Sequence, residues 1–266
     1  MPPDDLLNRV AKTNLAFSAL GNERFEAHGA TFVRNTATPN RYESNQVALV
    51  RADSPDDFEA ILRAADDAFA GFSHRMFSID AATPSAFQAR LALEQGYRAS
   101  DGLVQLLEGE LQATPHSVDI REVTSEDDWS LYRELDAMWW LESGTGDDAL
   151  GPYDERLHDE FMVNLRLKTP PVRRWFACVD GVPRAFFGSW PGENGIGMVE
   201  DLFCHPDYRH RGLATTLLAH AVADARARGA GPVIINSEPR DTPKQMYARM
   251  GFRPFYVQRT WLKKLV

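Results

Sequence analysis

Three basic or potentially basic side chains, Arg209, His210 and Arg211, lie together just before Gly212 in an otherwise acidic chain. They follow a strand-like segment and precede a helix-like one. Backbone N–H groups in the first turn of a helix lack partners and carry the positive end of the helix dipole, which favours an anion. Gly212 has no Cβ and lets the backbone approach that anion, and Ala214 is also small. The segment therefore predicts a phosphate-binding loop without a Walker lysine or GxGxxG. The alternative is a solvated helix start with ordinary surface arginines.

Two acids, Glu200 and Asp201, interrupt the apolar strand that leads into this loop. Neighbours on a strand point to opposite faces, so we expect them to face opposite sides. A carboxylate in this setting is a candidate general base, and the alternative is a strand acid paired with a nearby arginine. Cys204 is a candidate nucleophile, but no histidine is convincingly placed as its base, and a strand-end cysteine usually serves packing.

The surrounding pattern predicts the elements that hold these residues. Serine is a preferred N-cap residue, and acidic residues follow both Ser54 and Ser125, so each serine predicts the start of a helix. Asp180-Gly181 separates two apolar runs and predicts a hairpin turn. Helices are expected over 4–20, 54–71, 83–96, 125–140, 153–165, 213–229 and 242–251, and strands over 30–36, 45–51, 75–79, 103–109, 121–123, 173–179, 182–190, 196–204, 232–236 and 255–264.

The ends of the two halves repeat one pattern. "ARLALEQGYRASDGLVQLL" and "QMYARMGFRPFYVQRTWL" both indicate a helix, Gly-aromatic-Arg and a strand, and both helices follow a Thr-Pro start. Gly96 and Gly251 lie 155 residues apart, which favours an internal duplication. "EGELQATPHSVD" breaks the pattern near Thr114, so we predict domains over 1–113 and 114–266.

Composition excludes several function classes. The formal net charge of −9 argues against a general nucleic-acid binder. The two cysteines, Cys178 and Cys204, form no CxxC motif, and a reducing cytoplasm is expected. The acidic start is unlike a signal peptide, no apolar run reaches the length of a membrane span, and the histidines show no metal-ligand spacing, so we expect no membrane segment and no metal.

The order strand, "HPDYRHRGLA", helix, apolar strand, helix with "YARMGF" and final strand resembles the GNAT superfamily of acyl-CoA-dependent N-acyltransferases. The resemblance covers roughly 118–266 and implies an α/β fold with a mixed sheet. The sequence departs from the superfamily pattern at Arg240, where members often carry asparagine. It implies that acetyl-CoA binds, with no metal, along Leu202, Phe203, Cys204, Arg209, His210, Arg211, Gly212, Leu213, Ala214 and Thr215.

The resemblance also implies a reaction. An acetyl group would move from acetyl-CoA to a primary amine by direct attack in a ternary complex. Backbone N–H groups near Phe203 and Cys204 would stabilise the developing negative charge, and Tyr247 would protonate the thiolate. The alternative for Tyr247 is a helix tyrosine that packs against the sheet. We take Glu200 as the base, with Asp201 or a water chain as alternatives.

The acceptor residues are expected in the first two helices of the second half. Three aromatic residues there could form a wall for a small, cationic amine, although a solvated acidic loop is an equal alternative. These aromatic residues are Trp139, Trp140 and Tyr153, and the accompanying acids are Glu142, Asp147, Asp148, Asp154 and Glu155.

The first half lacks the anion-binding features. Its helix at Ser54 begins with Pro55, Asp56 and Asp57, so acids lie where the anion would bind, and Ala92 stands at the position that matches Tyr247. We interpret the chain as two tandem GNAT-like domains of which the second is complete, a monomer or homodimer. The alternative function is a non-catalytic acyl-CoA-binding sensor or interaction module.

Overall fold

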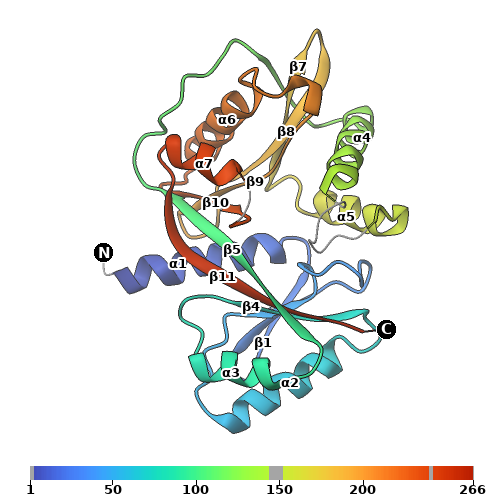
Figure 1. Ribbon diagram of the computed structural model, residues 1–266, viewed down its shortest axis with the longest axis vertical. Coiled ribbons are helices and arrows are strands. Elements are labelled where there is room, and N and C mark those ends of the chain that lie inside the picture. Colours follow the sequence, from blue (N-terminus) through green and yellow to red (C-terminus); the bar gives the residue numbers. More distant parts are fainter. Residues whose placement is uncertain (1–2, 144–151, 240–241, 266) are drawn as a thin grey trace.

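The computed structural model describes residues 3–143, 152–239 and 242–265 (Figure 1). The first half contains α1 (Pro3–Ala19), β1 (Glu23–Ala27), β2 (Ala30–Arg34), β3 (Gln46–Ala48), α2 (Pro55–Ala68), β4 (His74–Ile79), α3 (Ser85–Leu93) and β5 (Tyr97–Leu107). The second contains β6 (Asp119–Glu122), α4 (Glu126–Ser143), α5 (Glu155–Leu167), β7 (Arg173–Val179), β8 (Val182–Trp190), β9 (Gly197–Cys204), a short 3₁₀ helix (Pro206–Tyr208), α6 (Leu213–Ala227), β10 (Val233–Ser237), α7 (Pro243–Arg249) and β11 (Arg253–Lys264).

One mixed sheet of 11 strands runs through both halves, in the order β1-β2-β3-β4-β11-β5-β10-β9-β8-β7-β6. The expected α/β fold with a mixed sheet is confirmed. The β1 strand is additional to the strands expected from the sequence, and its alternation of exposed and half-buried residues is that of an edge strand. The domain limits of 1–113 and 114–266 stay a prediction, since backbone hydrogen bonds cross between the halves.

The two halves exchange their last strands. Strand β5 ends the first half but pairs with β10 of the second, and β11 ends the second half but pairs with β4 of the first. The two exchanged strands also pair with each other, antiparallel, from Arg253 opposite Leu106 to Lys263 opposite Tyr97. In Figure 1 they cross the middle of the molecule as the two long strands that join its upper and lower parts.

Local signals in the sequence form as expected. The Ser54 hydroxyl accepts the Asp57 N–H at 3.1 Å, and the Ser125 hydroxyl accepts the Asp128 N–H, also at 3.1 Å. Asp180 and Gly181 both have positive φ, at 52° and 77°, as a tight hairpin turn between β7 and β8 requires. The glycines of the repeat, Gly96 and Gly251, both adopt left-handed φ, at 88° and 101°.

Helices cover both faces of the second-half strands. The buried stripe of α6, which includes Leu217 and Leu218, packs against Ala185 and Phe187 on one face of β8. Phe186, the residue between them, faces the α4 and α5 side instead. Helix α1 of the first half packs across the boundary against β8, β9 and β10. No helix in the described ranges is both long and apolar enough to cross a membrane.

The sheet opens between β9 and β10. These parallel strands pair at Gly197–Met198 and Val233–Ile234, although β9 continues to Cys204 and β10 to Ser237. Just past the paired part, Asp201 has a φ of 63°, and the register of β9 against β8 shifts between Phe186 and Gly188. This is a β-bulge, which bends the strand and re-aims its side chains.

Candidate active site

The predicted phosphate-binding loop lies between the open end of β9 and α6. Gly212 caps α6 with φ 80° and ψ 0°, and no side chain caps the first turn of the helix. His210 also has a positive φ, of 60°. The loop therefore presents backbone N–H groups at the positive end of a 15-residue helix, as anion binding requires.

The linker between the halves lies against this loop, which the sequence did not indicate. A Cβ at Gly212 would lie 2.0 Å from Cδ2 of His116. The backbone N–H of His116 donates to the Thr216 hydroxyl at 3.0 Å and fixes the linker on the first turn of α6. Glycine is therefore favoured at 212 by its positive φ and by its close contact with the imidazole.

A cleft of about 790 Å³, here called the α6 cleft, opens at this loop. Its walls come from the end of α4, the end of β9, the loop, the first turn of α6, and α7. The expected cofactor residues that line it are Leu202, Phe203, Cys204, Arg209, His210, Gly212, Leu213, Ala214 and Thr215. Arg211 does not line it, because its guanidinium donates to the Asp207 carbonyl at 3.0 Å and lies over the Tyr208 ring.

The guanidinium of Arg209 lies at the cleft but is held by an acid from α4. It donates to both carboxylate oxygens of Glu142, at 2.7 and 2.5 Å, and to the Cys204 carbonyl at 3.1 Å. The hydrogen bond from Arg209 lowers the pKa of Glu142. An anion in the cleft therefore meets an arginine whose charge is already partly neutralised.

Replacing Glu142 with glutamine is expected to tighten the binding of a CoA nucleotide, because the arginine then keeps its full charge for phosphate. Both side chains are about two-fifths exposed, at 39% and 43%, so the gain is at most about 1 kcal/mol, or about fivefold in Kd. Calorimetry measures it. Glu126→Gln is the matched control, because Glu126 forms a similar two-point pair with Arg166 elsewhere on α4. Weaker binding in Glu142→Gln would show instead that Glu142 orients Arg209 for phosphate.

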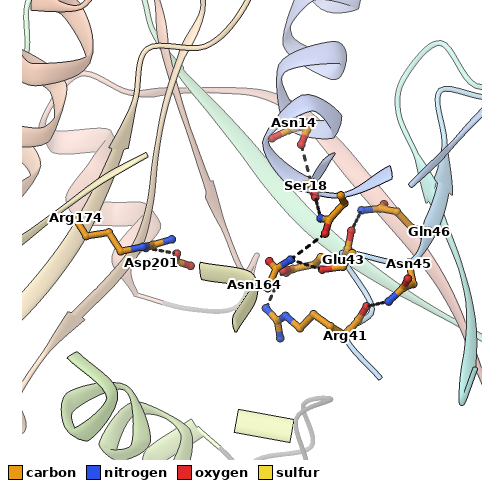
Figure 2. Close-up of polar contacts among 11 residues, drawn as sticks. Asn14, Ser18, Arg41, Glu43, Asn45, Gln46, Asn164, Arg174 and Asp201 are labelled. Atoms are coloured by element: carbon orange, nitrogen blue, oxygen red, sulfur yellow. Dashed lines mark hydrogen bonds and ion pairs between the residues drawn. The ribbon is translucent and has the colours of Figure 1, made fainter. Parts of the chain in front are cut away.

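Glu200 faces a second cavity, of about 230 Å³, here called the Glu200 cavity. It lies on the other side of the opening between β9 and β10, and both halves of the chain line it. Figure 2 shows the Arg174–Asp201 pair to one side of polar side chains from the first half, including Asn14, Glu43 and Gln46. The expectation that Glu200 and Asp201 face opposite sides is wrong. Both line this cavity, because the bulge at Asp201 breaks the strand's alternation.

The carboxylate of Glu200 is half-buried and weakly held. The backbone N–H of Asn236 on β10 donates to Glu200 Oε1 at 3.3 Å, and no described cation forms an ion pair with Glu200. Burial and the negative charges of Asp201 and Glu43 raise the pKa of Glu200 to about 8, while the Asn236 N–H and Lys168 oppose that shift. A carboxylate with this pKa is suited to accept a proton near neutral pH.

Asp201 is in a different electrostatic position. Its carboxylate accepts a hydrogen bond from the guanidinium of Arg174 at 2.9 Å, and Arg174 is only 2% exposed. The same Arg174 nitrogen donates to the Tyr132 hydroxyl at 3.2 Å. Because a buried guanidinium neutralises Asp201, Glu200 is the better placed of the two acids to act as a base. The sequence does not indicate this pairing, since Arg174 lies on β7, 27 residues away.

The proposed acid, Tyr247, and the candidate nucleophile, Cys204, lie in different places. Tyr247 is 4% exposed, packs in the α6 core with Phe252, and is not among the residues that line the cleft, although its neighbour Met246 is. Cys204 lines the cleft, and burial raises the pKa of its thiol, which disfavours a nucleophilic role.

The expected aromatic wall does not form as one surface. Trp139 lines the α6 cleft, whereas Trp140 packs against Tyr153 at 5.8 Å between ring centroids. Asp154 caps α5, Glu155 lies near Arg133, and Asp147, Asp148 and Arg240 lie outside the described residues. Within the described ranges, no cluster of three or more His, Cys, Asp or Glu side chains could hold a metal ion.

Comparison with known proteins finds a similarity in the second half. Residues 132–252 match the family model of the acetyltransferase (GNAT) family. None of the curated proteins compared with the chain matches it in sequence.

Solved structures share the fold over nearly the whole chain. A GCN5-related N-acetyltransferase from Kribbella flavida has a TM-score of 0.70 at 16% identity, covering 97% of this chain and 95% of its own. A functionally unknown conserved protein from Staphylococcus epidermidis has a TM-score of 0.70 at 16% identity, with coverages of 93% and 96%. A tandem GNAT protein from the clavulanic acid biosynthesis pathway has a TM-score of 0.60 at 13% identity, with coverages of 88% and 78%. The fold is therefore that of tandem GNAT proteins.

Proposed function

We propose that the chain is an N-acetyltransferase that uses acetyl-CoA and a primary amine, because residues 132–252 match the family model of the acetyltransferase (GNAT) family. One observation carries the proposal. The α6 cleft and the Glu200 cavity lie on either side of the opening between β9 and β10, and adjacent residues of β9 line them, Asp201 the cavity and Leu202 the cleft. A donor and an acceptor in these two places would meet at the opening.

The residues of the α6 cleft fit an acyl-CoA. Uncapped N–H groups of α6, together with Gly212 and Arg209, would hold the pyrophosphate. Leu202, Phe203 and Cys204 would lie beside the pantetheine arm, with backbone N–H groups near Phe203 as donors to developing negative charge. When bound, acetyl-CoA supplies the activated acetyl group.

The residues of the Glu200 cavity fit the acceptor side. The amine must be neutral to attack, and the carboxylate of Glu200 would take its proton. The two bound substrates would react directly, in one ternary complex. The first half contributes to this cavity but has no second phosphate site of the same kind, because Ser54 caps its helix and Asp56 and Asp57 occupy the first turn.

Tyr247 is proposed to protonate the leaving thiolate, and Tyr247→Phe tests that role. The substitution removes only a hydroxyl from a buried ring, so we expect turnover to fall by about 10²-fold while acetyl-CoA affinity stays nearly unchanged. A CoA-release assay measures turnover, and calorimetry measures the affinity for acetyl-CoA. Tyr97→Phe, in the first half, is the control. Equal turnover in Tyr247→Phe and the parent would reduce Tyr247 to a packing residue.

The proposed reaction is tested by incubating the full chain with acetyl-CoA and a panel of primary amines, with free CoA as the readout. Amine-dependent CoA release supports the proposal. Tight acetyl-CoA binding without release for any amine would favour the second candidate, a non-catalytic acyl-CoA sensor. This second candidate is retained because Tyr247, the proposed acid, is not among the residues that line the α6 cleft.

A further inference from the structure

The charged groups of the Glu200 cavity are paired except for two. Glu43 pairs with Arg41 at 2.8 Å, Asp101 with Arg259 at 2.7 Å, and Asp201 with Arg174 at 2.9 Å. Glu238 also interacts with other residues. Among the described residues that line the cavity, Glu200 and Lys168 are left as the charged side chains without an ion pair.

Lys168 is a buried ammonium with no hydrogen-bond acceptor among the described residues. It follows α5, is 4% exposed, and its Nζ lies 4.1 Å from the centre of the Phe17 ring of α1. It is also the one cationic side chain among the described residues of the cavity wall. Burial lowers the pKa of Lys168 to about 8, so it is still mostly protonated at neutral pH. The charges of Glu43 and Asp201 act on Lys168 but form no ion pair with it. A buried charge held without an ion pair is costly, and such a group in a cavity is a candidate for binding a ligand.

A second unsatisfied polar atom lies beside Glu200. The side-chain oxygen of Asn236 is buried and accepts no hydrogen bond from a described donor, while the Asn236 backbone N–H donates to Glu200. The Glu200 carboxylate and the Asn236 oxygen are both acceptors, so this end of the cavity suits a group that only donates, such as an amine. The Lys168 ammonium on the same cavity wall suits a group that only accepts.

We propose that the Glu200 cavity binds an acceptor that carries both an amine and a carboxylate, an amino acid or a molecule of that class. Lys168 holds the carboxylate, and Glu200 with Asn236 holds the amine. This inference rests on the proposed acetyltransferase function. The volume of about 230 Å³ is below that of sites for drug-sized ligands, which agrees with a small acceptor. A diamine fits less well, because its second ammonium would face Lys168.

The experiment compares matched pairs of acceptors that differ by one carboxylate: serine with ethanolamine, 4-aminobutyrate with propylamine, and lysine with 1,5-diaminopentane. The readout is kcat/KM for CoA release by the full chain. We expect at least one carboxylated member to exceed its partner by tenfold or more, the size of a charge-assisted hydrogen bond. Lys168→Met keeps the length of the side chain and should bring that ratio near one. Lys168→Arg should keep the preference, and Lys12→Met, on exposed α1 surface, should not change it.

The outcomes separate this inference from the proposed function. CoA release that is equal or faster with the decarboxylated amines, or a preference that survives Lys168→Met, overturns the carboxylate site and leaves the acetyltransferase standing. No CoA release with any member, while acetyl-CoA still binds in calorimetry, counts against the proposed function and therefore against both. Thermal melting of Lys168→Met confirms that the variant is folded, since methionine is an apolar replacement in a buried position.

Discussion

Replacing Gly212 with aspartate is expected to abolish acetyl-CoA binding in calorimetry, where we expect the parent chain to bind one equivalent. The side chain would enter at the cap of α6, against the His116 imidazole, and would bring a carboxylate to the turn whose uncapped N–H groups would contact a pyrophosphate. Its negative charge would repel the phosphates and occupy the favourable end of the helix dipole itself. Like charges in contact cost several kcal/mol, so affinity should fall by about 10²-fold or more.

Two control variants isolate the cause of that loss. Gly212→Asn has nearly the same shape as Gly212→Asp, and asparagine tolerates the left-handed φ of 80°, so the difference between them reports the charge. Both substitutions must displace the His116 side chain, so the steric effect is the same in the two variants. Gly181→Asp places an aspartate at a similar φ of 77° in an open hairpin turn and should bind normally. Unchanged affinity in Gly212→Asp would refute the phosphate site.

Sequence patterns predicted the local parts of the fold because short-range physics determines them. The Ser54 and Ser125 caps, the turn at Asp180-Gly181 and the buried stripe of α6 all depend on residues within a few positions. The loop around Gly212 was predictable for the same reason, since anion binding there needs only a helix start, a glycine and small neighbours.

Long-range features could not be predicted in this way. The exchange of β5 and β11 depends on pairings across about 150 residues, such as Arg259 with Asp101. The pairing of Arg209 with Glu142 spans 67 residues, and the contact of His116 with Gly212 comes from a linker of no distinctive composition. Strand alternation failed at Asp201 because its left-handed φ forms a bulge, which no residue type in "GMVEDLFC" indicates.

Glu200→Gln is expected to lower kcat/KM by about 10²–10⁴-fold and to remove one limb of the pH–rate profile. Burial and neighbouring negative charges raise the pKa of Glu200 to about 8, so the ionised form, which is the base, becomes populated as the pH rises through that value. The parent rate should therefore rise through about pH 8, and the glutamine variant should keep only the rise that belongs to the amine. An unchanged profile would transfer the base role to water or to Asp201.

The same pKa shift predicts the stability of Glu200→Gln, which distinguishes lost chemistry from lost folding. The folded pKa of about 8 lies above the ordinary value of 4.5, so protonated Glu200 stabilises the fold. That contribution is complete below pH 4.5 and is lost as pH rises through about 8. Glutamine never ionises, so the variant should be more stable than the parent at pH 9, by on the order of 2 kcal/mol for a half-buried carboxyl group. Denaturant melts at pH 5 and pH 9 measure the difference.

A catalytic base with a raised pKa requires a variant that is nearly inactive and yet more stable than the parent at pH 9. A variant less stable than the parent at both pH values would mean that Glu200 is a structural acid.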